Sequence, residues 1–176
     1  FWPRTLIGTL RSAWELETTR VQRRKISPWS LKNRRLRHPL NVAAFYSVAW
    51  LLGGLPAVGF AIAQSVVAIL LLETVNYLEH YGLERAQTSE GTYERVAPHH
   101  SWNSNHRITG WQMFYLNRHS DHHARADRPY PNLRAYSDAP NLPGGYPTMM
   151  LVAFIPPLWF AWMNPRVEAV RAKAAA

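Results

Sequence analysis

The sequence of 176 residues contains no cysteine. This absence excludes disulfide frameworks, thiolate zinc sites, iron–sulfur ligation and a cysteine nucleophile. The sequence also lacks an HExxH motif, a glycine-rich phosphate loop and a GxSxG motif. No segment shows the alternating apolar pattern of a strand-rich protein. We therefore expect an all-α fold whose chemistry depends on nitrogen and oxygen side chains.

Charge is also missing from a long part of the chain. Residues 41–72 contain no Asp, Glu, Lys or Arg, whereas residues 1–40 contain ten Lys or Arg against two Glu. A basic segment beside an uncharged one is typical of membrane topology rather than of a nucleic-acid-binding face. The aromatic content of 12% excludes an intrinsically disordered chain. A nucleic-acid partner is therefore the weakest interpretation, and membrane lipid the favoured surroundings.

The uncharged run predicts a transmembrane helical hairpin. One helix of this length would measure about 48 Å, which exceeds a hydrocarbon core of about 30 Å. The sequence Gly53-Gly54-Leu55-Pro56 is typical of a turn. We expect helices from about Pro39 to Gly53 and from Pro56 to about Leu83. The first is short for a full span, so it is tilted, extended or re-entrant. A hairpin buried in a soluble core remains the alternative.

The flanking segments complete the expected organisation. Residues 2–24 predict a helix, residues 146–163 an interfacial segment broken by Pro156-Pro157, and residues 166–176 a short, frayed helix. Whether residues 146–163 span the membrane stays open. The basic start predicts that residues 1–40 lie on the cytoplasmic side, and the hairpin returns residues 73 onward to that side.

Histidines are concentrated in one region of the chain. Seven of the eight fall between residues 80 and 123, and His38 stands apart in the basic segment. On a helix, His119, His122 and His123 share one face because they are spaced i, i+3 and i+4. Imidazoles converging in this way can hold a metal ion, and nitrogen ligands without thiolate suit zinc, copper, iron or nickel. The alternative is a solvated polar helix.

His80 lies at the end of the predicted long helix. Ionisable side chains at membrane depth are usually functional, so His80 is a candidate metal ligand. His99 and His100 lie in a loop and could be ligands, proton carriers or structural hydrogen-bonding groups, and His106 is interpreted as structural. Ser120 lies among histidines of the metal type, which makes a Ser–His hydrolase a weak hypothesis. The side chains that could support metal ligands through hydrogen bonds are Glu73, Asn76, Glu79, His99, His100 and Asp121.

Three motifs together resemble the membrane alkane 1-monooxygenase family. Residues 76–83, NYLEHYGL, are similar to the family's NYxEHYGL motif, and residues 100–104 match its HSWNS motif. Residues 116–124, LNRHSDHHA, resemble its LQRHSDHHA motif, with Asn117 where Gln is usual. The segments Gly145-Tyr146-Pro147 and 156–159 are also similar.

The resemblance implies a membrane helical bundle of the fatty acid desaturase/hydroxylase type with a cytoplasmic active site in the inner membrane. It implies a non-haem di-iron centre with His80, His119, His122 and His123 as ligands, the other ligands belonging to upstream HExxH-type and HxxxHH-type motifs. Residues 1–176 would then be the C-terminal part of one hydroxylase domain. That part would comprise a basic segment (1–40), a hairpin (41–83), a histidine-rich cap (84–145) and an interfacial tail (146–176).

The implied reaction is the terminal hydroxylation of medium- or long-chain n-alkanes to 1-alkanols with O2 and electrons from rubredoxin. The faces of residues 57–72 are candidates for an apolar substrate tunnel. A desaturase or a xylene-type methyl hydroxylase would share the histidine chemistry. A non-enzymatic metal-binding membrane protein is the alternative of another class, but there the histidines should line a path rather than cap helices.

Overall fold

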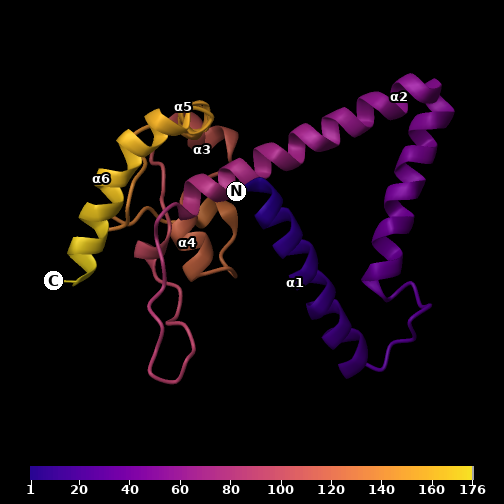
Figure 1. The fold of residues 1–176 in the computed structure, drawn as a ribbon, viewed down its shortest axis with the longest axis horizontal. Coiled ribbons are helices and arrows are strands. Elements are labelled where there is room, and N and C mark those ends of the chain that lie inside the picture. Colours follow the sequence, from indigo (N-terminus) through magenta and orange to yellow (C-terminus); the bar gives the residue numbers. More distant parts are fainter. Residues whose placement is uncertain (176) are drawn as a thin grey trace. The chain divides into compact units, whose positions relative to one another are not determined.

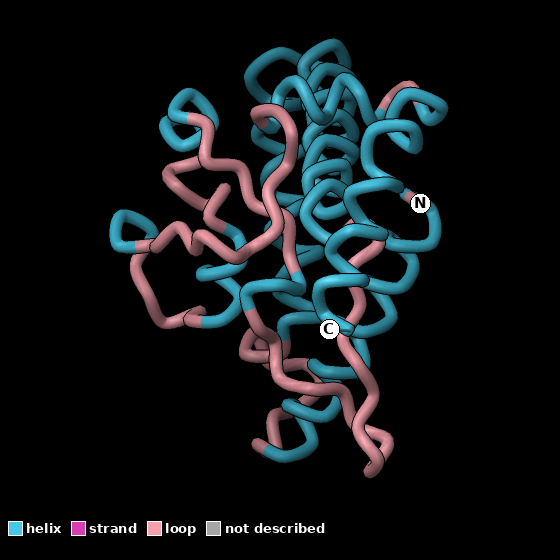
Figure 2. The backbone as a smooth tube through the Cα atoms, turned by 90° about the vertical axis from the view of Figure 1, so that its left-hand side faces the viewer, coloured by secondary structure: helices cyan, strands magenta, loops and turns pink. Residues whose placement is uncertain are grey.

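The computed structural model describes residues 1–175, and over that range the chain consists of helices and connecting loops (Figure 2). Only isolated bridges, such as that between Gln87 and Tyr93, pair extended residues there. The all-helical expectation is therefore confirmed. The chain divides into two compact parts, Phe1–Glu73 and Thr74–Ala176, which are described separately.

Helix α1 (Trp2–Arg23) and the start of helix α2 (Arg34–His80) are joined by a fixed turn. Glu17 accepts hydrogen bonds from the Arg20 side chain at 2.6 Å and from the backbone N–H of Arg34 at 2.8 Å. The hydrogen bond from Arg20 lowers the pKa of Glu17 to about 2. Asn33 Oδ1 accepts from Arg35 N at 3.1 Å and caps α2. This cap explains why α2 begins at Arg34, earlier than the predicted Pro39.

The predicted turn at Gly53-Gly54 is confirmed by a break inside α2 (Figure 1). Gly53 has φ −153° and Gly54 has φ 61° with ψ −152°, the latter a conformation that is essentially restricted to glycine. Tyr46 donates to Ser65 Oγ at 3.1 Å and so joins the two arms. By length and composition, helix α2 could cross a membrane. The helices α5 (Tyr146–Ala153) and α6 (Pro156–Ala175) meet the same criterion only as a bent pair, which suits either a broken span or a re-entrant loop.

The second part is built from short elements around the end of α2. Its hydrophobic core includes Leu78 from α2, Trp102 from a loop, and Met149, Trp159 and Met163 from the C-terminal helices. The elements that follow α2 are η1 (Pro98–His100), α3 (Arg107–Gln112), α4 (His119–Ala124), η2 (Tyr130–Asn132), α5 (Tyr146–Ala153) and α6 (Pro156–Ala175).

The C-terminal helices confirm one prediction and correct another. Helices α5 and α6 are bent by 119° where the broken segment was expected. The predicted frayed helix at residues 166–176 is instead the second half of α6, and Ala176 lies outside the described residues. Packing explains the difference, because Val167 is buried and Arg171 donates to the carbonyl of Gly82 at 2.9 Å.

Candidate metal centre

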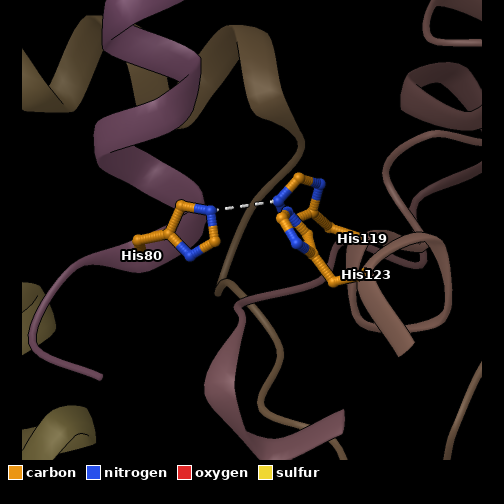
Figure 3. Close-up of side chains that lie close together, drawn as sticks. All are labelled: His80, His119 and His123. Atoms are coloured by element: carbon orange, nitrogen blue, oxygen red, sulfur yellow. Dashed lines mark hydrogen bonds between the residues drawn. The ribbon is translucent and has the colours of Figure 1, made fainter. Parts of the chain in front are cut away.

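Three imidazoles converge in the second part of the chain (Figure 3). His80 comes from the last residue of α2, and His119 and His123 come from one face of α4. Their ring centroids are 4.3–5.1 Å apart, and one ligand atom from each lies within 4.8 Å of the others. The structure thus brings together three of the four histidines that the sequence selected.

The facing nitrogens have the spacing of two ligands of one ion. His80 Nε2 and His119 Nε2 are 3.2 Å apart (Figure 3). Two nitrogens, each about 2.1 Å from a common ion and separated by about 90–109° at it, lie about 3.0–3.4 Å apart. The observed distance falls inside that range, so the donor pair fits a bound metal.

The outer nitrogen of His119 faces a hydrogen-bond acceptor. His119 Nδ1 lies 3.2 Å from Glu79 Oε1. A neutral imidazole that carries its proton on one nitrogen presents a lone pair at the other. With its proton on Nδ1, His119 would direct the Nε2 lone pair toward His80, an arrangement that a cation between the two rings would stabilise.

Burial keeps His119 in the protonation state that binds metal. Its side chain is only 8% exposed, whereas His80 and His123 are exposed. Burial, followed by the neighbouring His123, His80 and His122 rings, lowers the pKa of His119 to about 2. Neutral imidazole is the form that coordinates a metal, so this ring is ready for an ion at neutral pH.

His122 stands beside the converging group rather than inside it. Its ring centroid is 6.0 Å from that of His119 and 5.7 Å from that of His123. The half-buried ring therefore neighbours His119 and His123 without reaching the point at which the three rings converge. This separation suits a ligand of a second ion next to the first.

Helix α4 is held in place by the two residues between its histidines. The Ser120 backbone N–H donates to Asn103 Oδ1 at 2.9 Å, and its hydroxyl donates to the carbonyl of Pro98 at 2.6 Å. Asp121 is fully buried and accepts from Arg128 at 2.6 Å and from Tyr136 at 2.8 Å. From the sequence, Asp121 is a candidate to accept a hydrogen bond from the N–H of a metal-binding imidazole. Its carboxylate instead fixes the loop that follows α4.

A second group of possible ligands comprises Glu94, His99 and His100. His100 Nδ1 accepts from the backbone N–H of Ala97 at 2.9 Å, and its Nε2 lies 3.0 Å from Glu94 Oε1. An imidazole that accepts at Nδ1 carries its proton on Nε2, so Nε2 has no lone pair for a metal. The geometry favours the structural role for His100 among those left open by the sequence.

The remaining predicted residues are placed as follows. Glu73 is buried and its Oε2 has no hydrogen-bond partner, whereas Asn76 is exposed. His106 lies 3.0 Å from Ser104 Oγ through its Nδ1, which agrees with a structural role. His99 is exposed and its ring contacts that of His100. A supporting role for Glu73, Asn76 or His99 stays a prediction.

Residues 1–163 match the model of the fatty acid desaturase family, which is most of the chain. This chain is a member of the fatty acid desaturase family. The apolar helix α2 and the histidine cluster agree with membership, and together they indicate a metal-binding protein associated with a membrane.

This desaturase-family chain is also similar to curated relatives. It is 46% identical to the alkane 1-monooxygenase of Acinetobacter baylyi, over 95% of this chain and 41% of that protein. It is 46% identical to alkane 1-monooxygenase 2 of Alcanivorax borkumensis, over 96% of this chain and 44% of that protein. It is 31% identical to the hydroxylase component of the xylene/toluene monooxygenase of Pseudomonas putida, over 88% of this chain and 40% of that protein. The chain spans less than half the length of these relatives.

Sequence reasoning missed the partners of the buried carboxylates. Tyr146 contacts Glu79 across 67 residues of chain, and Tyr136 contacts Asp121 across 15. No periodicity relates residues so far apart. The similarity of Gly145-Tyr146-Pro147 to the family's sequence drew attention to Tyr146, but it did not indicate the contact with Glu79.

Proposed function

We propose that this chain forms part of a membrane alkane 1-monooxygenase that hydroxylates the terminal methyl group of medium- or long-chain n-alkanes. The observation that carries the proposal is the convergence of His80, His119 and His123, with facing nitrogens 3.2 Å apart, inside a desaturase-family fold. The similarity to alkane 1-monooxygenases supports the choice of substrate class.

In this proposal the histidines hold a non-haem di-iron centre. His80, His119 and His123 bind the first iron, and His122 binds the second together with ligands from outside this chain. A bound iron pair supplies the activation of O2 that insertion of oxygen into an unactivated C–H bond requires. The reaction R–CH3 + O2 + 2 e⁻ + 2 H⁺ → R–CH2OH + H2O balances with two external electrons.

The chain's own residues orient the ligands and set the charge of the site. Glu79 directs the outer nitrogen of His119, so that its Nε2 faces His80 Nε2 across the metal position. Burial of His119 keeps the ring neutral. An alkane offers no polar group for recognition, so specificity must depend on apolar surface of matching length and width.

We propose rubredoxin as the electron donor and the cytoplasmic face of the inner membrane as the location of the centre. Membership of the desaturase family and the basic segment of residues 1–40, which precedes the uncharged run, support this orientation. Electrons delivered one at a time by such a protein would satisfy the two-electron requirement of the reaction.

The second candidate is a methyl hydroxylase for alkyl-substituted aromatics. The specific observation in its favour is the 31% identity to the xylene/toluene monooxygenase component, which extends over 88% of this chain. The histidine geometry serves both reactions equally, because the two substrates differ only in the apolar group that carries the methyl.

Membranes containing the intact protein, supplied with rubredoxin, its reductase and NADH, separate these candidates. Octane, p-xylene and a saturated acyl lipid are offered in parallel and products are identified by gas chromatography with mass spectrometry. The proposal expects 1-octanol as the main product. Methylbenzyl alcohol or an unsaturated acyl chain in the absence of 1-octanol would refute it.

A further inference from the structure

Tyr146 joins the hydrophobic core to the candidate metal centre. Its hydroxyl donates to Glu79 Oε1 at 2.8 Å, and the same oxygen lies 3.2 Å from His119 Nδ1. The exposed fractions are 1% for Tyr146, 4% for Glu79 and 8% for His119, so water does not compete for these contacts. Three elements, α5, α2 and α4, meet at this carboxylate.

From this geometry we infer that Tyr146 is a positioning residue for the metal ligand His119, acting through Glu79. This inference rests on the metal centre of the proposed function. The hydroxyl fixes the carboxylate, the carboxylate orients the imidazole with its proton on Nδ1, and Nε2 is left to bind the ion. Partners of this kind raise the basicity of a ligand and hold its ring in the binding orientation.

The backbone of Tyr146 is anchored as firmly as its side chain. Its N–H donates to Thr109 Oγ1 at 3.2 Å, which ties the start of α5 to α3. A Cβ atom on the preceding Gly145 would lie 2.6 Å from that same Oγ1, so glycine permits the close approach. With backbone and hydroxyl both fixed, the tyrosine defines where the Glu79 carboxylate sits.

Tyr136 provides a matched control within the same part of the chain. It also donates to a buried carboxylate at 2.8 Å, but its partner Asp121 bonds to Arg128 and the backbone of Arg134 instead of an imidazole. Tyr136→Phe therefore removes an equivalent hydrogen bond without touching a proposed ligand. Tyr146→Phe removes the hydroxyl at the metal centre and keeps the aromatic ring in the core.

The test measures metal binding and not turnover alone. Fe²⁺ affinity of the intact protein in detergent is determined by competition with a chromophoric chelator, and Co²⁺ substitution gives a visible absorption spectrum that reports ligand geometry. Tyr146→Phe should weaken Fe²⁺ binding roughly 10–100-fold and shift the Co²⁺ bands. Tyr136→Phe should lower the melting temperature while Fe²⁺ affinity and Co²⁺ bands stay at wild-type values.

Glu79→Gln gives a second approach that keeps the shape of the side chain but replaces its carboxyl group with an amide. It should weaken Fe²⁺ binding at least as much as Tyr146→Phe, because the carboxylate contacts His119 directly. Wild-type affinity in Tyr146→Phe, or equal losses in Tyr146→Phe and Tyr136→Phe, would overturn the positioning role alone. Wild-type protein that binds no Fe²⁺ would overturn the metal centre and this role with it.

Discussion

At the scale of single residues, the environment of each imidazole separates its role from that of its neighbours. His119 is buried, and its Nδ1 lies beside the Glu79 carboxyl group. His100 accepts a hydrogen bond from a backbone N–H through its Nδ1, and His38 is exposed near the start of α2. All three are chemically identical in the sequence. Of these three rings, we propose His119 as a ligand because its Nε2 faces His80 Nε2 at 3.2 Å.

Replacing His122 tests the second metal position. His122→Ala removes the ring that stands beside the converging group, so one iron of the pair should be lost and alkane turnover should fall at least about 100-fold, beyond the loss expected from a supporting residue. Iron content per protein and octanol formation in the intact enzyme measure the effect. His38→Ala should leave both at wild-type values. A folded His122→Ala protein with full iron content and turnover would contradict the assignment.

At the scale of elements, glycine sets both limits of the second arm of α2. The break at Gly53 and Gly54 folds the arms together, and Gly82 turns the chain directly after His80 with φ 69°. A Cβ atom on Gly82 would lie 2.7 Å from Val167 of α6. The end of α2 thus packs against α6 only because residue 82 has no side chain, and this contact helps to fix the position of His80.

Replacing Gly82 and Gly91 in turn by alanine separates the stability lost through a packing clash from the stability lost through backbone strain. Gly82→Ala introduces both a positive-φ penalty and a clash with Val167, and should lower the free energy of unfolding by about 2–5 kcal/mol. Gly91→Ala has the same kind of φ, 77°, with open space around it, and should cost only about 1 kcal/mol. Chemical denaturation in detergent measures both. Equal losses would show that the contact with α6 contributes nothing.

At the scale of the whole molecule, charge and apolar surface are divided between segments. Residues 1–40 are rich in Lys and Arg, and residues 41–72 are uncharged and expose large apolar side chains such as Leu51 and Leu52. Seven of the eight histidines follow in the second part. This order suits a protein whose hairpin lies in lipid and whose chemistry takes place at the membrane surface. Desaturase-family membership agrees with that arrangement.

A topology reporter tests the side of the membrane on which the centre lies. In the proposed topology the two arms of the hairpin cross the membrane and return, so alkaline phosphatase fused after Leu83 should remain cytoplasmic and therefore inactive. A fusion at Gly54, in the turn between the arms, should be active in the periplasm. Strong phosphatase activity after Leu83 would exclude the hairpin topology.

The sequence by itself determined the helical hairpin and the face that carries the histidines. The uncharged run with a Gly-Gly turn favours two apolar helices joined by a break, and the spacing of His119, His122 and His123 puts the rings on one face of any helix. Both features are local, so chain geometry alone fixes them. The motifs around His80 and His119 also indicated the family.

The tertiary structure alone decided which side chains support the ligands. The contacts of Tyr146 with Glu79, of Asp121 with Arg128, and of Val167 with Gly82 join residues on separate elements. Such pairs depend on how helices pack around Leu78 and Trp102 in the core, and packing follows from the shapes of many side chains at once. No spacing rule in the sequence carries that information.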